Sequence, residues 1–362
     1  MRRRSLSLSA VIALLAAGCF SYLAIGQHLY ASYHHAYATY QFAPAGSCGA
    51  LIAWSPPAVL YAGLYVNQRE LVTVRYRSAT PQTLRISVSV PRFTQEETIQ
   101  VQAASAFQSQ SFKPPLFDST VLDSLVSPDR RDAQLHLRVE TSNDTVCDTT
   151  APMVLMSRQW IHWTNGLAGD NAALLAGWVT PQAAAVAALV GRTDEWIVQH
   201  PAAYDGITAL RGYDGGRAST QDVREQVNAL FDTLQGDYHL HYASDNVVFG
   251  RDQRIQLPQD VLRNSPPSGM CVETTVIMAS AIERLGMRSF IVLVPGHAFL
   301  GVALGLNPAA PISYWETSFL DFNSASQANV NGEAEYNQFA SQDAVRVIDI
   351  SYERSVGVEP ME

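Results

Sequence analysis

The chain has 362 residues, 47% of them hydrophobic, and a formal net charge of −9 at pH 7. Aromatic and branched residues run throughout, which excludes a disordered chain and leaves room for one large domain or two ordinary ones. No block of Lys or Arg follows residue 4, so nucleic acid is excluded as an expected partner.

Residues 1–26 are expected to form a membrane-targeting segment. Residues 2–4 are all Arg and precede a long apolar stretch, the order found in export signals. Three interpretations stay open. Residues 6–26 are long enough for one membrane-spanning helix with its basic end in the cytoplasm. Residues 15–19, Leu-Ala-Ala-Gly-Cys, resemble a bacterial lipoprotein signal in which Cys19 is lipidated. The segment could also be a simple secretion signal. All three place the remaining chain outside the cytoplasm, on the periplasmic side of a bacterial-type membrane, and the first two tether it there.

The next segments are expected to be a tether and a β-sandwich-like domain. Residues 27–47 are rich in Tyr, His and Ala without a clear period, and we interpret them as the tether. Within residues 48–155, the runs Leu71–Tyr76, Leu84–Val90 and Gln134–Glu140 alternate apolar and polar residues, as half-buried strands do. Clusters of Pro, Ser, Asp and Asn separate such runs, which favours a small sandwich such as the immunoglobulin type.

The chain has four cysteines, at positions 19, 48, 147 and 271. Cys48 and Cys147 bracket the expected β domain, and an oxidising compartment would let them form a disulfide. Closing a loop of about 100 residues would contribute about 4–5 kcal/mol in the chain-entropy model. With Cys19 in the targeting segment, Cys271 remains as a free thiol outside the cytoplasm, where it is open to oxidation.

Residues 156–362 are expected to form a second domain, of α+β class. A helix is predicted from Thr220, because apolar residues recur at intervals of three and four until Gly236 ends the run. Two histidine pairs, His34 with His35 and His239 with His241, lack a third ligand at suitable spacing. We therefore expect no metal site, and no other cofactor.

Cys271 follows a Pro-Pro-Ser-Gly-Met loop and opens the run Val272–Leu285, which is apolar around most of its circumference. This pattern predicts a buried helix that ends at Gly286. Cys271 would lie at the exposed N-terminus of this helix, where unpaired N–H groups and the positive end of the dipole favour a thiolate.

Three strands are predicted after this helix, over residues 289–294, 298–304 and 312–316. His297 follows the Pro-Gly turn between the first two strands. The 26 residues from Cys271 to His297 suffice to run along the helix and return along the first strand, so His297 can reach the start of the helix. Glu316, one strand further on, could then lie beside His297 and orient its imidazole.

These residues resemble a known superfamily. Gly269-x-Cys271, the buried helix, the sequence Gly296-His297-Ala-Phe and an acidic residue on the next strand resemble the transglutaminase-like, papain-related cysteine-site proteins. The resemblance covers about residues 220–320. It implies an α+β core in which the helix packs on an antiparallel sheet.

The resemblance also implies roles for single residues. Cys271 would be the nucleophile, His297 the base and Glu316 the third member, in a place where the superfamily usually has Asp. Asp321 is the alternative third member. Tyr242, upstream of the Cys loop, is the candidate for assisting the oxyanion.

Two functions follow as hypotheses. In the first, the Cys271 thiolate attacks an amide carbonyl and forms a thioester, with His297 as acid and base. Water as acceptor gives a peptidase or amidase, which we favour, and an amine gives a transglutaminase-type cross-linker. The substrate would be a protein or peptide of the cell envelope. In the second, the same fold is catalytically inactive and serves as a membrane-tethered binding or scaffold module.

Overall fold

The computed structural model describes residues 46–48, 51–67, 70–118, 120–122, 124–125, 130–163, 170–244 and 251–361. The expected targeting segment, Cys19 and the His34-His35 pair lie outside these ranges, as does almost all of the expected tether. Among the described helices, none combines the length and the apolar character that crossing a bilayer requires. The described chain is a mixture of helices and strands, as the sequence predicts.

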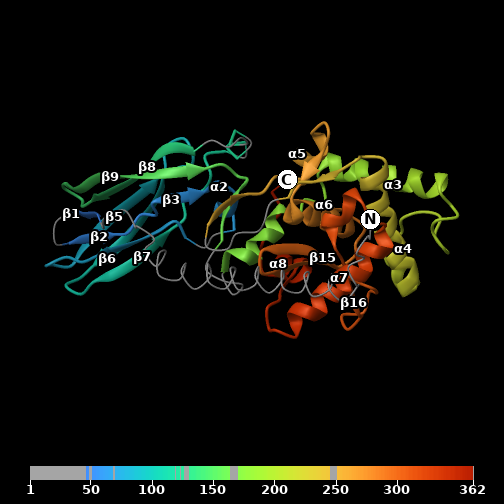
Figure 1. Ribbon diagram of the computed structural model, residues 1–362. Coiled ribbons are helices and arrows are strands. Elements are labelled where there is room, and N and C mark those ends of the chain that lie inside the picture. Colours follow the sequence, from blue (N-terminus) through green and yellow to red (C-terminus); the bar gives the residue numbers. More distant parts are fainter. Residues whose placement is uncertain are drawn as a thin grey trace, which may run out of the picture.

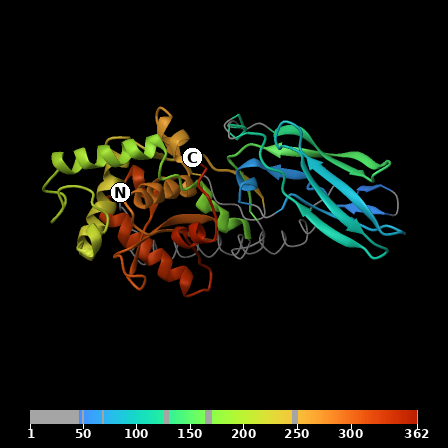
Figure 2. The ribbon, with the colours of Figure 1, turned by 180° about the vertical axis from the view of Figure 1, so that it is seen from behind.

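The molecule has two lobes, which lie at opposite ends in both views (Figures 1 and 2). The β lobe, residues 46–156, holds nine strands in the described ranges and one short helix. They are β1 (Gly46–Cys48), β2 (Ile52–Trp54), β3 (Val59–Tyr61), α2 (Ala62–Tyr65), β4 (Val72–Tyr76), β5 (Gln82–Ser89), β6 (Glu97–Ala103), β7 (Gln108–Phe112), β8 (Arg130–Glu140) and β9 (Thr145–Met156).

Two sheets make up the β lobe. One has the strand order β1-β2-β4-β7 and the other the order β3-β9-β8-β5-β6. Val74 and Phe112 from the first sheet share one fully buried cluster with Ile86 and Leu137 from the second. Alternate residues of longer strands such as β5 and β8 enter this cluster, which is why the period of two seen in the sequence marks these strands.

The α/β lobe, residues 157–361, contains the remaining elements. They are β10 (Trp160–His162), η1 (Asp170–Trp178), α3 (Ala184–Gln199), η2 (Asp214–Gly216), α4 (Thr220–Gly236), β11 (His241–Tyr242), β12 (Asp252–Arg254), α5 (Pro258–Arg263), β13 (Ser268–Gly269), α6 (Cys271–Arg284), β14 (Ser289–Val294), β15 (His297–Ala303), β16 (Ile312–Trp315), η3 (Thr317–Asp321), α7 (Ala325–Ala340), β17 (Arg346–Asp349) and α8 (Ile350–Ser355).

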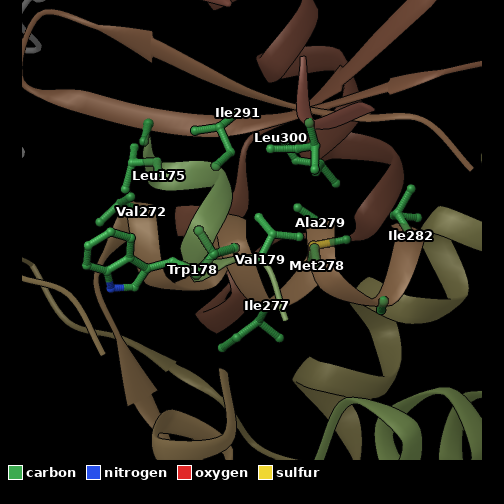
Figure 3. Close-up of a cluster of buried hydrophobic side chains, with 14 of the residues drawn as sticks. Leu175, Trp178, Val179, Val272, Ile277, Met278, Ala279, Ile282, Ile291 and Leu300 are labelled. Atoms are coloured by element: carbon green, nitrogen blue, oxygen red, sulfur yellow. The ribbon is translucent and has the colours of Figure 1, made fainter. Parts of the chain in front are cut away.

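A four-stranded sheet with the order β16-β15-β14-β17 forms the centre of this lobe, and all its neighbouring strands are antiparallel. Helix α6 covers one face. Figure 3 shows Ile291 and Leu300 pointing from the sheet toward Val272 and Met278 of α6. Helix α7 covers the other face.

The predicted helix from Thr220 is confirmed as α4. It begins where the Ser219 hydroxyl accepts a hydrogen bond from the backbone N–H of Asp222, whose carboxylate bonds back to Ser219. The helix predicted after Cys271 is confirmed as α6, and the three strands predicted after it are confirmed as β14 to β16. Strand β17 and helices α7 and α8, all beyond residue 320, are additions that the sequence pattern did not indicate.

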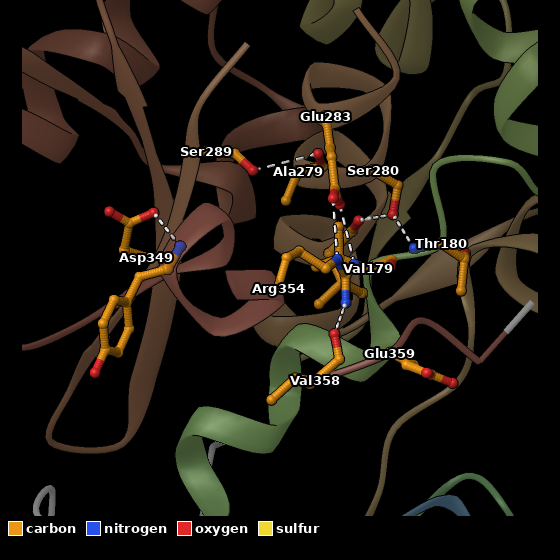
Figure 4. A network of polar contacts seen from close by, with 12 residues as sticks. Val179, Thr180, Ala279, Ser280, Glu283, Ser289, Asp349, Arg354, Val358 and Glu359 are labelled. Atoms are coloured by element: carbon orange, nitrogen blue, oxygen red, sulfur yellow. Dashed lines mark hydrogen bonds and ion pairs between the residues drawn. The ribbon is translucent and has the colours of Figure 1, made fainter. Parts of the chain in front are cut away.

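The C-terminal segment ties the lobe together through Arg354 of α8 (Figure 4). Its guanidinium donates to both carboxylate oxygens of Glu283 on α6, at 3.0 Å each, and to the carbonyls of Val179 and Val358. The far end of α6 is thereby fixed to segments from both ends of the lobe.

Candidate active site

Cys271 is the first residue of α6, and the loop before it is held on two sides. The Glu273 carboxylate accepts hydrogen bonds from the backbone N–H groups of Met270, at 3.0 Å, and Gln256, at 2.7 Å. Burial raises the pKa of Glu273, although these hydrogen bonds oppose the rise. Gly269 fits this turn because a Cβ there would lie 3.3 Å from the Cβ of Glu273. The start of α6 is therefore fixed by its own first turn.

Strand β11 holds the loop from the other side. It pairs in parallel with β13, so that Tyr242 lies opposite Gly269. The N–H of His241 donates to the Pro267 carbonyl at 3.0 Å. The Tyr242 side chain is half-buried against the core of the lobe. The structure thus brings Tyr242 to the loop that carries Cys271.

Cys271 itself is a free thiol with an exposed fraction of 0%. The expectation that it lies at an exposed helix start is wrong. Met270 and Val272 on either side are buried in the same hydrophobic cluster, which encloses the first turn of α6. A substrate carbonyl can reach this sulfur only after the surrounding chain moves.

His297 is the first residue of β15 and follows a tight turn. Gly296 has a φ of +80°, a left-handed conformation that favours glycine, and the space around it is open. The Nε2 of His297 lies 2.7 Å from Oε2 of Glu316. The imidazole also hydrogen-bonds the thiol of Cys271. Because Nε2 is engaged by Glu316, Nδ1 is the nitrogen available to the sulfur.

Glu316 follows β16 directly and caps η3. Its Oε1 accepts a hydrogen bond from the Ser318 N–H at 2.8 Å, and the residue is 2% exposed. Burial would raise the pKa of Glu316, but the hydrogen bond and charge of His297 lower it from 4.5 to about 2. Glu316 is therefore an ionised carboxylate with a donor on each oxygen.

The charge of His297 follows from its two partners. Burial would lower the pKa of the imidazole, but hydrogen bonds with Cys271 and Glu316, together with their charges, raise it from 6.5 to about 11. The ring is then an imidazolium at neutral pH, placed between a sulfur and a carboxylate. This arrangement can hold a thiolate and return a proton to a leaving group.

Asp321, the alternative third member, has other partners. Its two carboxylate oxygens accept hydrogen bonds from Nδ1 of His241 and from the N–H of Tyr242, each at 2.7 Å. Asp321 thereby holds strand β11 beside the loop that carries Cys271. The carboxylate that contacts His297 is that of Glu316.

Glu335 on α7 was missed by the sequence reasoning. Its carboxyl hydrogen-bonds Glu316. Over the described ranges, His297, Glu316 and Glu335 are the one group of His, Cys, Asp or Glu that could hold a metal ion, with ligand atoms within 4.8 Å of one another. Hydrogen bonds join Glu316 to His297 on one side and to Glu335 on the other.

The other cysteines lie in the β lobe. Cys147 is disulfide-bonded. Cys48 ends strand β1, and its side chain lies outside what the structure describes. The Cys48–Cys147 pairing therefore stays a prediction.

No protein-family model and no curated protein sequence matches this chain.

Proposed function

We propose that this protein is an extracytoplasmic, cysteine-dependent enzyme of the transglutaminase-like type, acting on amide bonds through an acyl-enzyme. One observation carries the proposal: His297 contacts the free thiol of Cys271 on one side and the carboxylate of Glu316, at 2.7 Å, on the other. A nucleophile, a base within reach of it and a third group that orients the base are the signature of covalent catalysis.

The finer fold assignment is part of the proposal. Helix α6 packs on an antiparallel sheet, the thiol stands at the start of that helix, and the histidine opens the second strand of the sheet. This order of elements is what the superfamily resemblance implies for residues 220–320. The superfamily usually has Asp in the place of Glu316. The longer Glu side chain still reaches Nε2 of His297.

The reaction follows from the charges. The Cys271 thiolate attacks the amide carbonyl carbon, and the carbonyl electrons move to oxygen. The backbone N–H of Cys271, in the first turn of α6, donates to this oxyanion, and Tyr242 is the candidate second donor. When the C–N bond breaks, the His297 imidazolium gives its proton to the leaving amine, and a thioester remains.

The thioester is then released. Neutral His297 takes a proton from water as the water oxygen attacks the thioester carbonyl. The C–S bond breaks, the acid leaves, and the thiolate–imidazolium pair is restored. An amine in place of water gives a new amide instead. We favour hydrolysis, because water competes with an amine unless a dedicated acceptor site exists. The substrate class we propose is a protein or peptide of the cell envelope, reached by a chain that its N-terminal segment exports and tethers.

A second function has an observation of its own. The complete burial of Cys271 fits a catalytically inactive fold that serves as a membrane-tethered binding or scaffold module. In that case the thiol would be an inert core residue.

The test uses casein peptides and a fluorescent primary amine as probes, with mass spectrometry to detect new peptide termini and amine adducts. We expect new termini with the wild-type protein and none with Cys271→Ser or His297→Gln. His136→Gln is the matched control, since it removes a histidine that pairs with Asp148 at 2.7 Å in the β lobe. Equal products from wild type and Cys271→Ser would refute thiol catalysis and favour the binding module.

A further inference from the structure

Helix α7 lies unusually close to strand β16. A Cβ at Gly332 would stand 2.7 Å from the carbonyl carbon and oxygen of Tyr314, so only glycine allows this approach. The N–H of Glu316 donates to the Ala328 carbonyl at 2.9 Å, and Nδ2 of Asn329 donates to the Tyr314 carbonyl at 2.8 Å. The helix is docked on the strand through main-chain contacts.

The rotation of α7 about its axis is also fixed. The ring of Tyr336 stacks on that of Tyr314, with centroids 4.0 Å apart and planes 11° from parallel. On the neighbouring turn, Oε1 of Glu333 accepts from the Ser313 hydroxyl. Glu335 lies between Glu333 and Tyr336 in the sequence. It also lies one helical turn beyond Gly332, and residues three apart on a helix share a face. Its carboxyl is thereby brought to that of Glu316.

Two carboxyl groups in contact cannot both be ionised at low cost. The groups that face Glu335 are Glu316, at the end of β16, and His297 on β15. Burial, and then the hydrogen bond and charge of Glu316, raise the pKa of Glu335 from 4.5 to about 8, while His297 opposes the rise. Glu316 accepts hydrogen bonds from His297, at 2.7 Å, and from the Ser318 N–H, at 2.8 Å, and both favour its ionised form, so the shared proton belongs to Glu335.

We infer that Glu335 is a positioning residue of this site, whose protonated carboxyl donates to the Glu316 carboxylate and holds it in line with His297. The inference rests on the proposed function for its role in the reaction. The chain of contacts then runs from Cys271 through His297 and Glu316 to α7. Glu335 touches neither the sulfur nor a substrate, and it acts through Glu316. Ionisation of Glu335 places a second negative charge beside the His297–Glu316 pair.

The test is a pH titration of histidine side-chain resonances in the full-length protein by NMR. The chain has nine histidines, and His297→Gln identifies the resonance of interest. Because His297 keeps its proton well above pH 8, its own titration does not hide a step there. We expect an inflection of the His297 shift near pH 8 in the wild type, and its loss in Glu335→Gln, which keeps a donor of the same shape but cannot ionise.

Glu333→Gln is the matched control, because Glu333 lies on the same helix but bonds Ser313 rather than Glu316. It should keep the inflection. An inflection that survives in Glu335→Gln, or that is absent from the wild type, would overturn the inference. If the inflection behaves as expected while Cys271 proves unreactive, the coupling stands and the proposed function fails. If Cys271 is reactive and the inflection ignores Glu335, the function stands and this inference fails.

Discussion

At the scale of residues, the site depends on a histidine that is bonded on both sides. His297 reaches Glu316 because Glu316 stands at the end of the neighbouring strand, and the carboxylate is fixed by Ser318 and Glu335. The Glu316 side chain is therefore long enough to orient His297 in the role that we propose for it.

Single substitutions test these roles. Cys271→Ala should abolish activity, and His297→Gln should lower kcat/KM by roughly 10²- to 10⁴-fold, as loss of a general acid–base does. Glu316→Gln should lose less, since a neutral amide still bonds His297. Steady-state kinetics on a cleaved casein peptide measure all three.

Asp321→Asn should lower the activity only slightly, because Asp321 bonds His241 and Tyr242. If Glu316→Gln keeps full activity while Asp321→Asn is inactive, Asp321 rather than Glu316 is the third member of the site.

Much of this site could be predicted at the residue scale, for physical reasons. A cysteine at a helix start and a histidine after a Pro-Gly turn are local signals, and the length of one helix and one strand brings them together. The burial of Cys271 could not be read from the sequence, because it depends on packing by segments distant in the chain. Glu335 carries no local signal, since its partner comes from another element.

At the scale of elements, the contact of α7 with β16 is the feature that delivers Glu335. Apolar residues at intervals of three and four revealed α4. Continuous apolar runs revealed α6, β14 and β15, which are buried on nearly all sides. Most residues of α7 are small or polar, and only Tyr336 and Phe339 near its end pack on the apolar side chains of the sheet, so hydrophobic periodicity could not reveal this helix. Its docking depends instead on the absence of a side chain at Gly332.

Gly332→Ala tests this contact. The added methyl meets main-chain atoms of Tyr314, which cannot move aside as a flexible side chain would. We expect a loss of about 1–3 kcal/mol in the free energy of unfolding, as for other overpacked sites, and a loss of activity through displaced Glu335. Urea denaturation measures the first effect.

Gly191→Ala is the matched control for this substitution, since Gly191 lies in helix α3 with nothing within 4 Å of the added Cβ. It should stabilise the protein by about 0.4–1 kcal/mol. Equal effects of the two changes would show that α7 does not dock as described.

At the scale of the whole molecule, a β lobe and an α/β lobe are joined in a chain that we propose is exported and tethered. The two-part organisation could be predicted because strand patterns give way to helical ones near residue 156. The contacts that join the lobes could not, because they link segments far apart in sequence, such as Tyr61 with Asp252.

The disulfide of the β lobe gives a test at this scale. Cys147 is disulfide-bonded and Cys271 is free, and we predict that the partner of Cys147 is Cys48. Peptide mapping without reducing agent should recover this pair. Reduction should destabilise the β lobe by about 4–5 kcal/mol in the chain-entropy model. A bond between Cys147 and Cys271 in active protein would contradict both the pairing and the site.

The most direct measurement of the central claim is the alkylation rate of Cys271 by iodoacetamide as a function of pH, followed by mass spectrometry. If His297 is an imidazolium paired with a thiolate, the alkylation rate of the native protein should change little between pH 6 and pH 9, although burial of the sulfur lowers the rate itself. The urea-unfolded chain, whose thiol ionises only near pH 8.5, should react much faster as the pH rises through this range. His297→Gln should make the native rate depend on pH in the same way as that of the unfolded chain. A wild-type rate that rises with pH as steeply as that of the unfolded chain would contradict the account and identify the thiol as an inert part of the core.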